Sequence, residues 1–567
     1  SGGATRHSMK EVEMPSAAGA PAQKKSKPSF ARGLFAGRVD EDLIFPYPRL
    51  DGDEAEALDM VLAEFNRFAG DHLHGADFDT RMEIPQEFIR QLGELGMLGF
   101  TVPEEYGGSG FSTGAYCRLM QAVCRYCAAT ATVIGGHQSI GIKGILMFGS
   151  EEQKREFLPR MASGEWIGAY ALTEPGSGSD AAAMTTRAVY DEADDVWVLN
   201  GSKQWITNGG FSQVFTVFAK TPAEPGTKPT QAISCFLVKR ELNGVSTTPP
   251  MHKMGIRGSN TVDVVFENVR VPGGHLLGQQ GRGFKMAMEI LNTGRLSLAS
   301  GCIGSAREMI DASVKFALER KAFGHTISEL EMIRHKFALM MAETYAAEAM
   351  VYLTTGLCDR GGLDFSIESA MSKTFAGEVL WRVVNHAVQI NGGNGYMSEY
   401  PYERFLRDAR INMIFEGTNE IMRLYISMTG MRDAAAAATA PSLTRVHRAL
   451  AAEAEAAAVM TRTFAGAMEQ TVARHGKDLP ARGYVQERVA DAIIDLYALL
   501  AVLSRCTARL EAAGEEGAAR DITLTRLFAR QARDRFERNI ALLAGPDDEL
   551  LTAASEVAYK DGGYRLT

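Results

Sequence analysis

The 567-residue sequence lacks an apolar run of the roughly 20 residues that a membrane-spanning helix needs. Its longest apolar stretch, IIDLYALLAVL at 493–503, is short and contains Asp495, so a buried helix is the better interpretation. Residues 1–30 have no apolar core of a secretory signal, and their small residues, Pro and Lys predict a disordered tail. We therefore expect a soluble protein without a secretory signal.

Cysteine is scarce, and positive charge is not in excess. Of the seven cysteines, only Cys124 and Cys127 form a C-x-x-C pair. A zinc site would need a second pair, so we expect buried thiols in a reducing compartment and no metal, with redox or metal chemistry as the alternative. The net charge of −9 argues against electrostatic binding of nucleic acid, although a few local arginines could still bind an anionic ligand.

Hydrophobic periodicity divides the chain into parts that differ in the spacing of their apolar residues. Residues 51–168 and 285–430 repeat apolar residues at helical spacing, whereas 169–284 contains short β-branched and aromatic runs expected to be antiparallel strands. An alanine-rich segment at 433–444 is typical of a linker, and long helical patterns follow it. The predicted fold is mostly α with a central antiparallel β domain. The expected parts are 1–50 (disordered tail and extended segment), 51–168, 169–284, 285–430 and 431–567.

Three glycine-rich stretches are candidate ligand loops, and each has a purely structural alternative. AYALTEPGSGSDAA at 169–182 could bring backbone N–H groups to a phosphate, or could simply turn between a helix and a strand. In GSKQWITNGG at 201–210, Trp205 could be core or the wall of a cofactor site. QINGGNGYM at 389–397 could be an ordinary helix C-cap.

The stretch INMIFEGTNEIMRLY at 411–425 carries the candidate catalytic residue, Glu416. Locally, an acidic residue near a helix start is unremarkable, because the helix dipole favours it and Thr418 or Asn419 could cap the helix. The alternative is a general base kept partly dry, with Ile414 and Phe415 as its apolar wall.

Taken together and in this order, YALTEPGSGSD, WITNGG, ALERKAFG, QINGGNGY and IFEGTNEI resemble the acyl-CoA dehydrogenase family over residues 51–430. Further stretches, FARGLFAGRVDEDLIFPYP, GGHQSIGIKGILMFGS and RVADAIIDLYALLAVLSR, are similar to its very-long-chain branch, which has an additional C-terminal helical domain. The resemblance implies that family's fold: a helical domain, a β-barrel-like domain and a helical bundle.

The resemblance also implies FAD as the cofactor, because no side chain can accept a hydride. It implies that Glu416 is the base that removes the α-proton, with its own backbone N–H helping to bind the thioester oxygen. Around the flavin it places Tyr170, Leu172, Thr173, Gly178, Ser179, Trp205, Ile206, Thr207, Thr418 and Glu420. Residues that hold the adenine half of the flavin of a neighbouring subunit would be Arg320, Phe323, Gln389, Gly392 and Gly393.

For the substrate, the resemblance implies contacts from Ser179, Asn292, Arg295 and Gly417. It makes TATVIGGHQSIGIKG the floor of the acyl pocket, where the small residues Ala131, Thr132, Gly135 and Gly136 would leave a tunnel open for long chains. The alternatives are a surface ion pair for Arg295 and close helix packing for the glycines.

The implied function is the oxidation of long-chain acyl-CoA to trans-2-enoyl-CoA in fatty acid β-oxidation, with electrons passed to an electron-transferring flavoprotein by a homodimeric enzyme. An acyl-CoA oxidase and a non-enzymatic assembly scaffold are the alternatives. The location would be the cytoplasm in a bacterium and the mitochondrial matrix side in a eukaryote. The alanine-rich segment after residue 433 has little bulky apolar surface, so we expect no stable membrane anchor.

Overall fold

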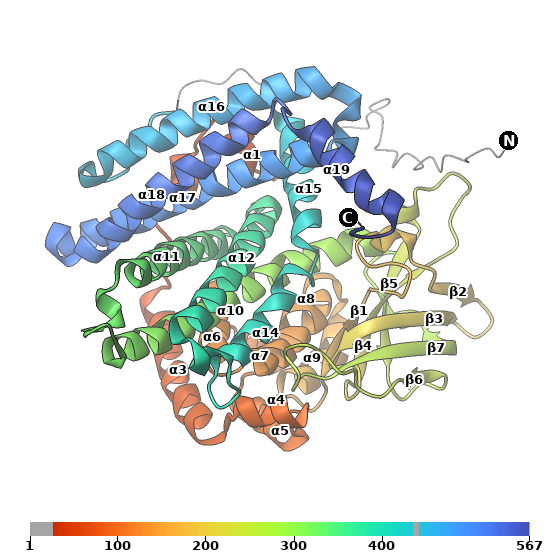
Figure 1. Cartoon of the computed structure of the whole chain (residues 1–567). Helices are drawn as coiled ribbons and strands as arrows, with labels where there is room; N and C mark the ends of the chain where they lie inside the picture. Colours follow the sequence, from red (N-terminus) through yellow and green to blue (C-terminus); the bar gives the residue numbers. More distant parts are fainter. Residues whose placement is uncertain (1–26, 435–440, 566–567) are drawn as a thin grey trace.

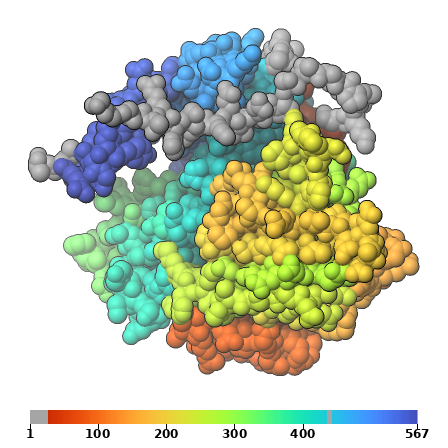
Figure 2. Space-filling model, turned by 90° about the vertical axis from the view of Figure 1, so that its right-hand side faces the viewer, coloured from red at the N-terminus to blue at the C-terminus, as the bar shows by residue number. Residues whose placement is uncertain are grey.

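The computed structural model describes residues 27–434 and 441–565. Figure 1 shows a β domain at one side, N-terminal helices beneath, a bundle of long helices in the middle and further helices above. In the turned view of Figure 2, the β domain occupies the centre of the visible face. Among the described residues, no helix combines the length and apolarity of a bilayer span.

The first described segment is helical where the sequence suggested an extended segment. Two short helices, α1 (Phe30–Phe35) and α2 (Glu41–Ile44), bury their apolar residues in the same core as the bundle and the C-terminal helices. The buried carboxylate of Glu368 accepts the Ala31 N–H at 2.8 Å and the Ser29 hydroxyl at 3.1 Å. Residues 27–29, 36–40 and 45–50 are not α-helical, so the segment is helical only in part; the tail predicted for 1–26 lies outside the described residues.

The N-terminal helices form one side of the central site. All seven cysteines are free, and Cys124 and Cys127 are buried, as predicted. Between α7 and α8 the helix widens into a π-helical segment, a form that is often found at functional sites. The elements are α3 (Gly52–His72), α4 (Gly75–Arg81), α5 (Gln86–Glu94), α6 (Thr113–Tyr126), α7 (Ala128–Gly135), η2 (Gly136–Ile142), α8 (Lys143–Phe148) and α9 (Glu151–Ala162).

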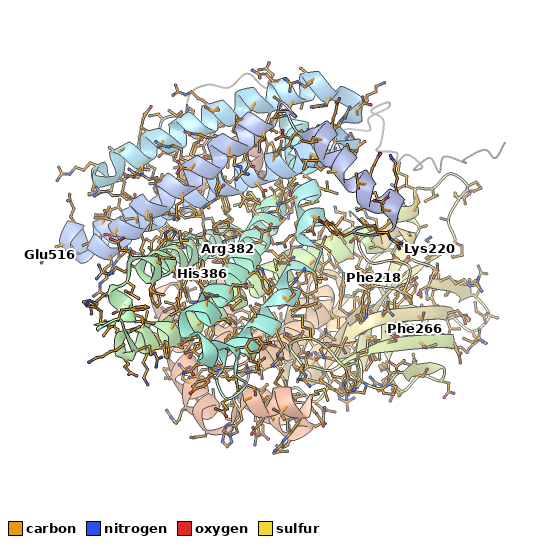
Figure 3. All side chains as sticks on the ribbon, viewed as in Figure 1. Phe218, Lys220, Phe266, Arg382, His386 and Glu516 are labelled. Atoms are coloured by element: carbon orange, nitrogen blue, oxygen red, sulfur yellow. The ribbon has the colours of Figure 1, made fainter. Side chains whose placement is uncertain are left out.

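The β domain is a mixed sheet and not a purely antiparallel one. Its order is β6-β7-β3-β2-β4-β5-β8, and β1 also pairs with β4. Both β1 and β2 run parallel to β4, which corrects the prediction; long connections allow this, since a tight hairpin forces antiparallel pairing. Phe218 and Phe266 belong to its core (Figure 3). The strands are β1 (Gly168–Ala171), β2 (Arg187–Asp191), β3 (Val196–Thr207), β4 (Val214–Lys220), β5 (Ile233–Lys239), β6 (Val245–Thr247), β7 (Thr261–Pro272) and β8 (Leu276–Leu277).

The bundle and the C-terminal helices share one hydrophobic core. Figure 1 shows α16, α17 and α18 lying above the bundle helices. Ion pairs cross this junction, for example from Arg423 to Asp491 at 2.7 Å. The bundle has α10 (Gly283–Glu319), the hairpin β9 (Lys321–Ala322) and β10 (His325–Thr326), α11 (Glu331–Asp359), α12 (Ser366–Asn391), α13 (Gly393–Tyr396), α14 (Tyr402–Ala409) and α15 (Asn419–Gly430). The C-terminal helices are α16 (Ala451–His475), α17 (Gly483–Gly517), α18 (Ala519–Leu542) and α19 (Asp548–Asp561); residues 435–440 of the predicted linker lie outside the described residues.

Candidate active site

A cavity of about 340 Å³ lies where the N-terminal helices, the β domain and the bundle meet. It contains most of the site residues that the sequence indicated, brought together from separate parts of the chain. Those lining it are Gly135, Gly136, Tyr170, Leu172, Thr173, Gly178, Ser179, Trp205, Ile206, Thr207, Asn292, Arg295, Glu416 and Gly417.

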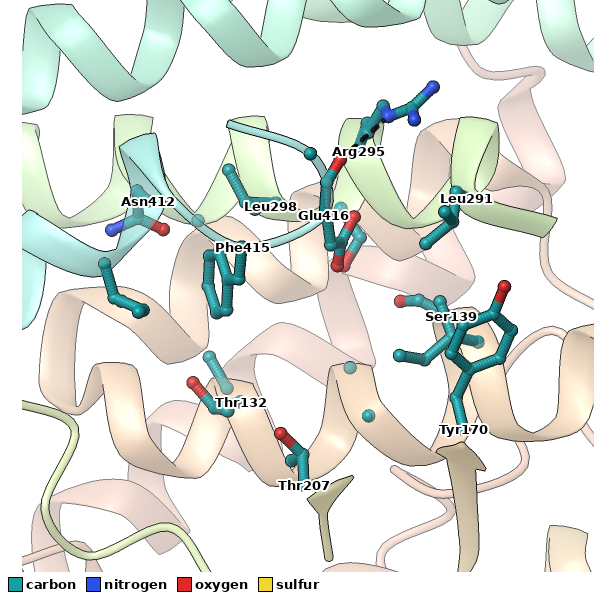
Figure 4. A pocket seen from close by; sticks show the side chains of 18 of the residues that line it. Thr132, Ser139, Tyr170, Thr207, Leu291, Arg295, Leu298, Asn412, Phe415 and Glu416 are labelled. Carbon is teal, nitrogen blue, oxygen red and sulfur yellow. Dashed lines mark hydrogen bonds between the residues drawn. The ribbon is translucent and has the colours of Figure 1, made fainter. Parts of the chain in front are cut away.

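Glu416 lies on the loop between α14 and α15, and its carboxylate enters the cavity (Figure 4). Its Oε2 atom is buried and has no hydrogen-bond partner among the described residues. Burial raises the pKa of this carboxyl to about 7, against the opposing effects of Arg295 and Lys373. A carboxylate with a raised pKa and an unsatisfied oxygen facing a cavity is a candidate general base.

The apolar surroundings of Glu416 differ in part from the prediction. Phe415 lines the cavity, as expected, but Ile414 is 46% exposed and lies outside the lining. Leu298 and Met422 contribute apolar surface in its place. The sequence could not show this difference. A loop next to a helix start has no regular periodicity from which to predict which side chains face the cavity and which face solvent.

The backbone at Glu416 is held in an unusual conformation. Its φ is +55°, in the left-handed region that residues with a side chain rarely adopt, and Gly417 follows with φ +93°. Thr418 then caps α15, since its side chain accepts the Ile421 N–H at 3.3 Å, as one of the sequence alternatives predicted. Glu416 therefore precedes the helix and is directed away from it, so the cap and the catalytic candidate coexist.

Arg295 of α10 supports this loop from behind. Its guanidinium Nε donates to the Glu416 carbonyl oxygen at 3.1 Å, and Nη1 donates to Asn292 Oδ1 at 3.0 Å. In Figure 4 the guanidinium and the Glu416 carboxylate point in opposite directions. The contact of Arg295 with CoA stays a prediction, whereas its contact with the loop was not predicted.

Two strands of the β domain form the opposite wall. Trp205 is 60% exposed and has φ +59°, at a bulge in β3, so the alternative that made it a core residue is wrong. Ile206 is buried behind it. The loop after β1 is anchored by Lys203, whose Nζ donates to Leu172 O at 3.1 Å and to Glu174 at 2.8 Å. An exposed aromatic face and a loop with glycines open to solvent suit a flat cofactor and its phosphates.

The remaining predicted residues lie outside this cavity. Phe323, at the β9–β10 turn, is 89% exposed with φ +55°, and Arg320, Gln389, Gly392 and Gly393 are also exposed. Glu420 is exposed in the first turn of α15. An exposed phenylalanine in a left-handed conformation needs an explanation beyond the fold of one chain.

The sequence did not indicate several residues of the site. Lys373 of α12 is fully buried and donates from Nζ to the Gly417 carbonyl at 2.7 Å and to Asn419 Oδ1 at 2.8 Å. Its sequence signal is weak, since SAMSKTFAG shows only one lysine in a short stretch without other charge. The cavity is also lined by Met120, Cys124, Ala128, Gly301, Cys302 and Ser305, which only the folded chain brings together.

Comparisons with known proteins agree with this arrangement. Family models match in chain order: acyl-CoA dehydrogenase N-terminal domain at 55–165, middle domain at 169–269, C-terminal domain at 281–431, and ACAD9/ACADV C-terminal domain at 448–560. A curated relative, the mitochondrial very long-chain specific acyl-CoA dehydrogenase of Macaca fascicularis, is 38% identical over 92% of this chain and 85% of its own.

Two solved structures extend the likeness to three dimensions. An acyl-CoA dehydrogenase from Bacillus anthracis complexed with FAD has a TM-score of 0.82 at 32% identity, covering 91% of this chain and 92% of that one. A chain from a structure described as the electron transferring flavoprotein of Acidaminococcus fermentans has a TM-score of 0.63 at 36% identity, covering 67% and 98%.

Proposed function

The chain belongs to the acyl-CoA dehydrogenase family, and on that basis we propose that it oxidises long-chain acyl-CoA to trans-2-enoyl-CoA, with an electron-transferring flavoprotein as electron acceptor. The enzyme is a flavoprotein of fatty acid oxidation, and the cavity walls fit FAD. The observation that carries the proposed chemistry is the buried, unpartnered Oε2 of Glu416, which faces the cavity opposite Trp205 and Thr207.

In this reaction Glu416 takes the proton from the carbon next to the thioester carbonyl. Because such a C–H is only weakly acidic, the base must be close to it and partly desolvated. As negative charge develops on the thioester oxygen, the Glu416 N–H is available to stabilise it, since that N–H donates no hydrogen bond within the described part of the chain. FAD, when bound, supplies the acceptor for the hydride from the β-carbon.

A spectroscopic experiment tests the reaction class. The purified protein should show flavin absorption, and anaerobic palmitoyl-CoA should bleach it. Return of the oxidised flavin spectrum when an electron-transferring flavoprotein is added would support that protein as the acceptor. Hydrogen peroxide at the full turnover rate in air would instead assign an oxidase, and a flavin that stays oxidised would remove the dehydrogenase assignment.

The pH dependence of kcat/KM should follow the protonation of the Glu416 carboxyl. Its pKa is raised to about 7, so the carboxyl is protonated and unable to accept the α-proton at lower pH. We expect kcat/KM for palmitoyl-CoA to fall about tenfold per pH unit below pH 7, because this ratio reports groups of the free enzyme. A profile that stays flat down to pH 5 would contradict the raised pKa.

The exposed set around Phe323 fits a second copy of the chain. We propose a homodimer in which Arg320, Phe323, Gln389, Gly392 and Gly393 hold the adenine half of the partner's FAD. This would explain why they lie outside the cavity of their own chain and why Phe323 is exposed in a left-handed conformation.

Arg320 offers a direct test of this arrangement. Arg320→Ala should weaken FAD retention by about 10–100-fold, the value of a hydrogen bond to a charged group. Lys321→Ala, on the same exposed hairpin, is the matched control and should retain FAD normally. Equal FAD occupancy of the two variants after dialysis, or a monomer by light scattering, would contradict the shared site.

A further inference from the structure

Two buried cations hold the loop that carries Glu416, one from each of two bundle helices. Arg295 of α10 donates to the Glu416 carbonyl at 3.1 Å, and Lys373 of α12 donates to the next carbonyl, that of Gly417, at 2.7 Å. The side chain of Lys373 is completely buried, and Arg295 is 4% exposed. Consecutive carbonyls of the loop thus each receive a charged donor.

These contacts bear directly on the direction of the Glu416 side chain. Both Glu416 and Gly417 have left-handed backbone angles, which are unfavourable for a residue with a side chain. A peptide in the ordinary right-handed or extended region would turn the carbonyls away from the two cations. Fixing the carbonyls therefore fixes the backbone, and the backbone directs the carboxylate into the cavity.

Lys373 has no partner of opposite charge that would explain its burial. Among residues 27–434 and 441–565, no carboxylate lies within 4.0 Å of its Nζ. Its second partner is neutral Asn419, which in turn donates to Glu378 at 3.1 Å. Glu416 is the carboxylate that acts most strongly on it. A buried lysine without a paired carboxylate is costly and calls for a role.

From this geometry we infer that Lys373 is a positioning residue for proton abstraction, which holds the Gly417 carbonyl and places a positive charge behind the Glu416 carboxylate. The inference rests on the proposed role of Glu416 as the base. Lys373 acts through the loop and its field, and it is absent from the residues that line the cavity. Removing its charge should therefore change the protonation of Glu416 as well as the rate.

The other titratable groups around Glu416 should not obscure a change in its pKa when the charge of Lys373 is removed. Arg295 is the second cation, and Tyr116, Tyr170 and Cys302 are the further titratable groups that interact electrostatically with the carboxylate. Burial raises the pKa values of the two phenols and the thiol, so they stay neutral near pH 7. Burial lowers the pKa of Lys373 to about 8, so its charge is present there. Loss of this charge must raise the pKa of Glu416.

The test is the anaerobic rate of flavin bleaching by palmitoyl-CoA from pH 5.5 to 8.5. Lys373→Gln keeps an uncharged donor for the loop, and Lys373→Met removes the donor as well. Both should move the acid limb of the profile upward by about one pH unit, and Lys373→Met should also slow bleaching at pH 7 by about tenfold or more. Lys373→Arg, which keeps the charge, should restore the position of the limb.

Thr374→Val is the matched control, because the hydroxyl of this buried neighbour donates to the Ala370 carbonyl of its own helix and to no other group in the described part of the chain. It should leave the profile unchanged. Rates lowered equally at every pH with an unmoved limb in Lys373→Gln, or a wild-type profile in Lys373→Met, would overturn the inference. If Glu416→Gln bleaches normally, the proposed base fails independently of Lys373, so the two failures are distinguishable.

Discussion

Replacing Glu416 with glutamine should lower turnover of palmitoyl-CoA by about 10³-fold or more while FAD stays bound, since a positioned general base contributes roughly 10²–10⁴-fold. Glutamine has nearly the shape of the glutamate but cannot accept the proton. This loss should be large because Glu416 is the one carboxylate among the described residues that line the cavity, so no second acidic group there can take over the proton. Glutamine also removes the buried negative charge beside Arg295 and Lys373.

The measurement separates chemistry from binding. Flavin absorption gives FAD occupancy, and titration with a non-reducible substrate analogue should show nearly unchanged affinity. Glu399→Gln, a substitution at an exposed glutamate outside the cavity, controls for the loss of a charge. If Glu416→Gln turns over within tenfold of wild type, Glu416 does not act as the base.

Much of the architecture could be predicted from periodicity because the elements are long or strongly patterned. Helix α12 and strand β4 have unambiguous hydrophobic patterns, and the change from a helical to a strand pattern near residue 168 is sharp. Strand β1 is only four residues long and runs straight into the glycine-rich loop, so its sequence resembled the loop. Its parallel pairing depends on where β4 lies in space, which no local pattern encodes.

The site was predictable where residue identity marks the chemistry. The local stretch left Glu416 open between an ordinary acid at a helix start and a desolvated base, and the resemblance to the acyl-CoA dehydrogenase family favoured the base. Lys373 was missed because one lysine in a helix usually reaches solvent, and only the packing of α12 against α10 and the loop shows that it cannot. The exposure of Trp205 depends on a bulge in β3, and bulges have weak sequence signals.

The length of the acyl pocket can now be estimated from the helix that lines it. The reacting end of the acyl chain would lie beside Gly294, which is next to the Glu416 carboxylate. A Cβ built at Gly294 would lie 2.9 Å from Glu416 Oε2 and 3.0 Å from Ile140 Cγ2. The lining then follows the chain from Ser139 back to Ala128. These twelve residues are joined by eleven steps and rise about 16 Å at roughly 1.5 Å per step. An extended chain advances about 1.25 Å per methylene, given C–C bonds of roughly 1.5 Å, so about 13 carbons fit beyond the reacting end.

We therefore expect kcat/KM for saturated acyl-CoAs to reach its maximum between C14 and C18, with poor use of C4. Each buried CH₂ contributes up to about 0.8 kcal/mol, so C16 could exceed C12 by up to about 3 kcal/mol, or about 200-fold, before the cost of ordering the chain. A series from C4 to C20 measures this directly. If C8 is already the best substrate, the pocket is shorter than its lining indicates.

Gly136 lines the cavity but is unsuited to testing the length of this pocket. A side chain at Gly136 would start 2.9 Å from Thr207 Cγ2 and 3.1 Å from Asn208 Nδ2, so it would disturb the wall predicted to contact the flavin. Substitution at Gly136 therefore cannot isolate chain length. Ala131 lines the cavity about 12 Å from Ser139 along the helix, which corresponds to about nine or ten carbons, well beyond a C8 chain.

Ala131→Leu should move the maximum to C8–C12 and lower kcat/KM for C16 by about 10-fold or more while leaving C8 turnover intact, because the added methylenes occupy the volume of the distal chain. Ala131→Ser changes polarity with little added bulk and should keep the C14–C18 maximum, which makes it the matched control. Thermal midpoints of both variants show whether the bundle still packs. An equal loss at every chain length in Ala131→Leu would assign the small residues of α7 to helix packing, and the open tunnel would be wrong.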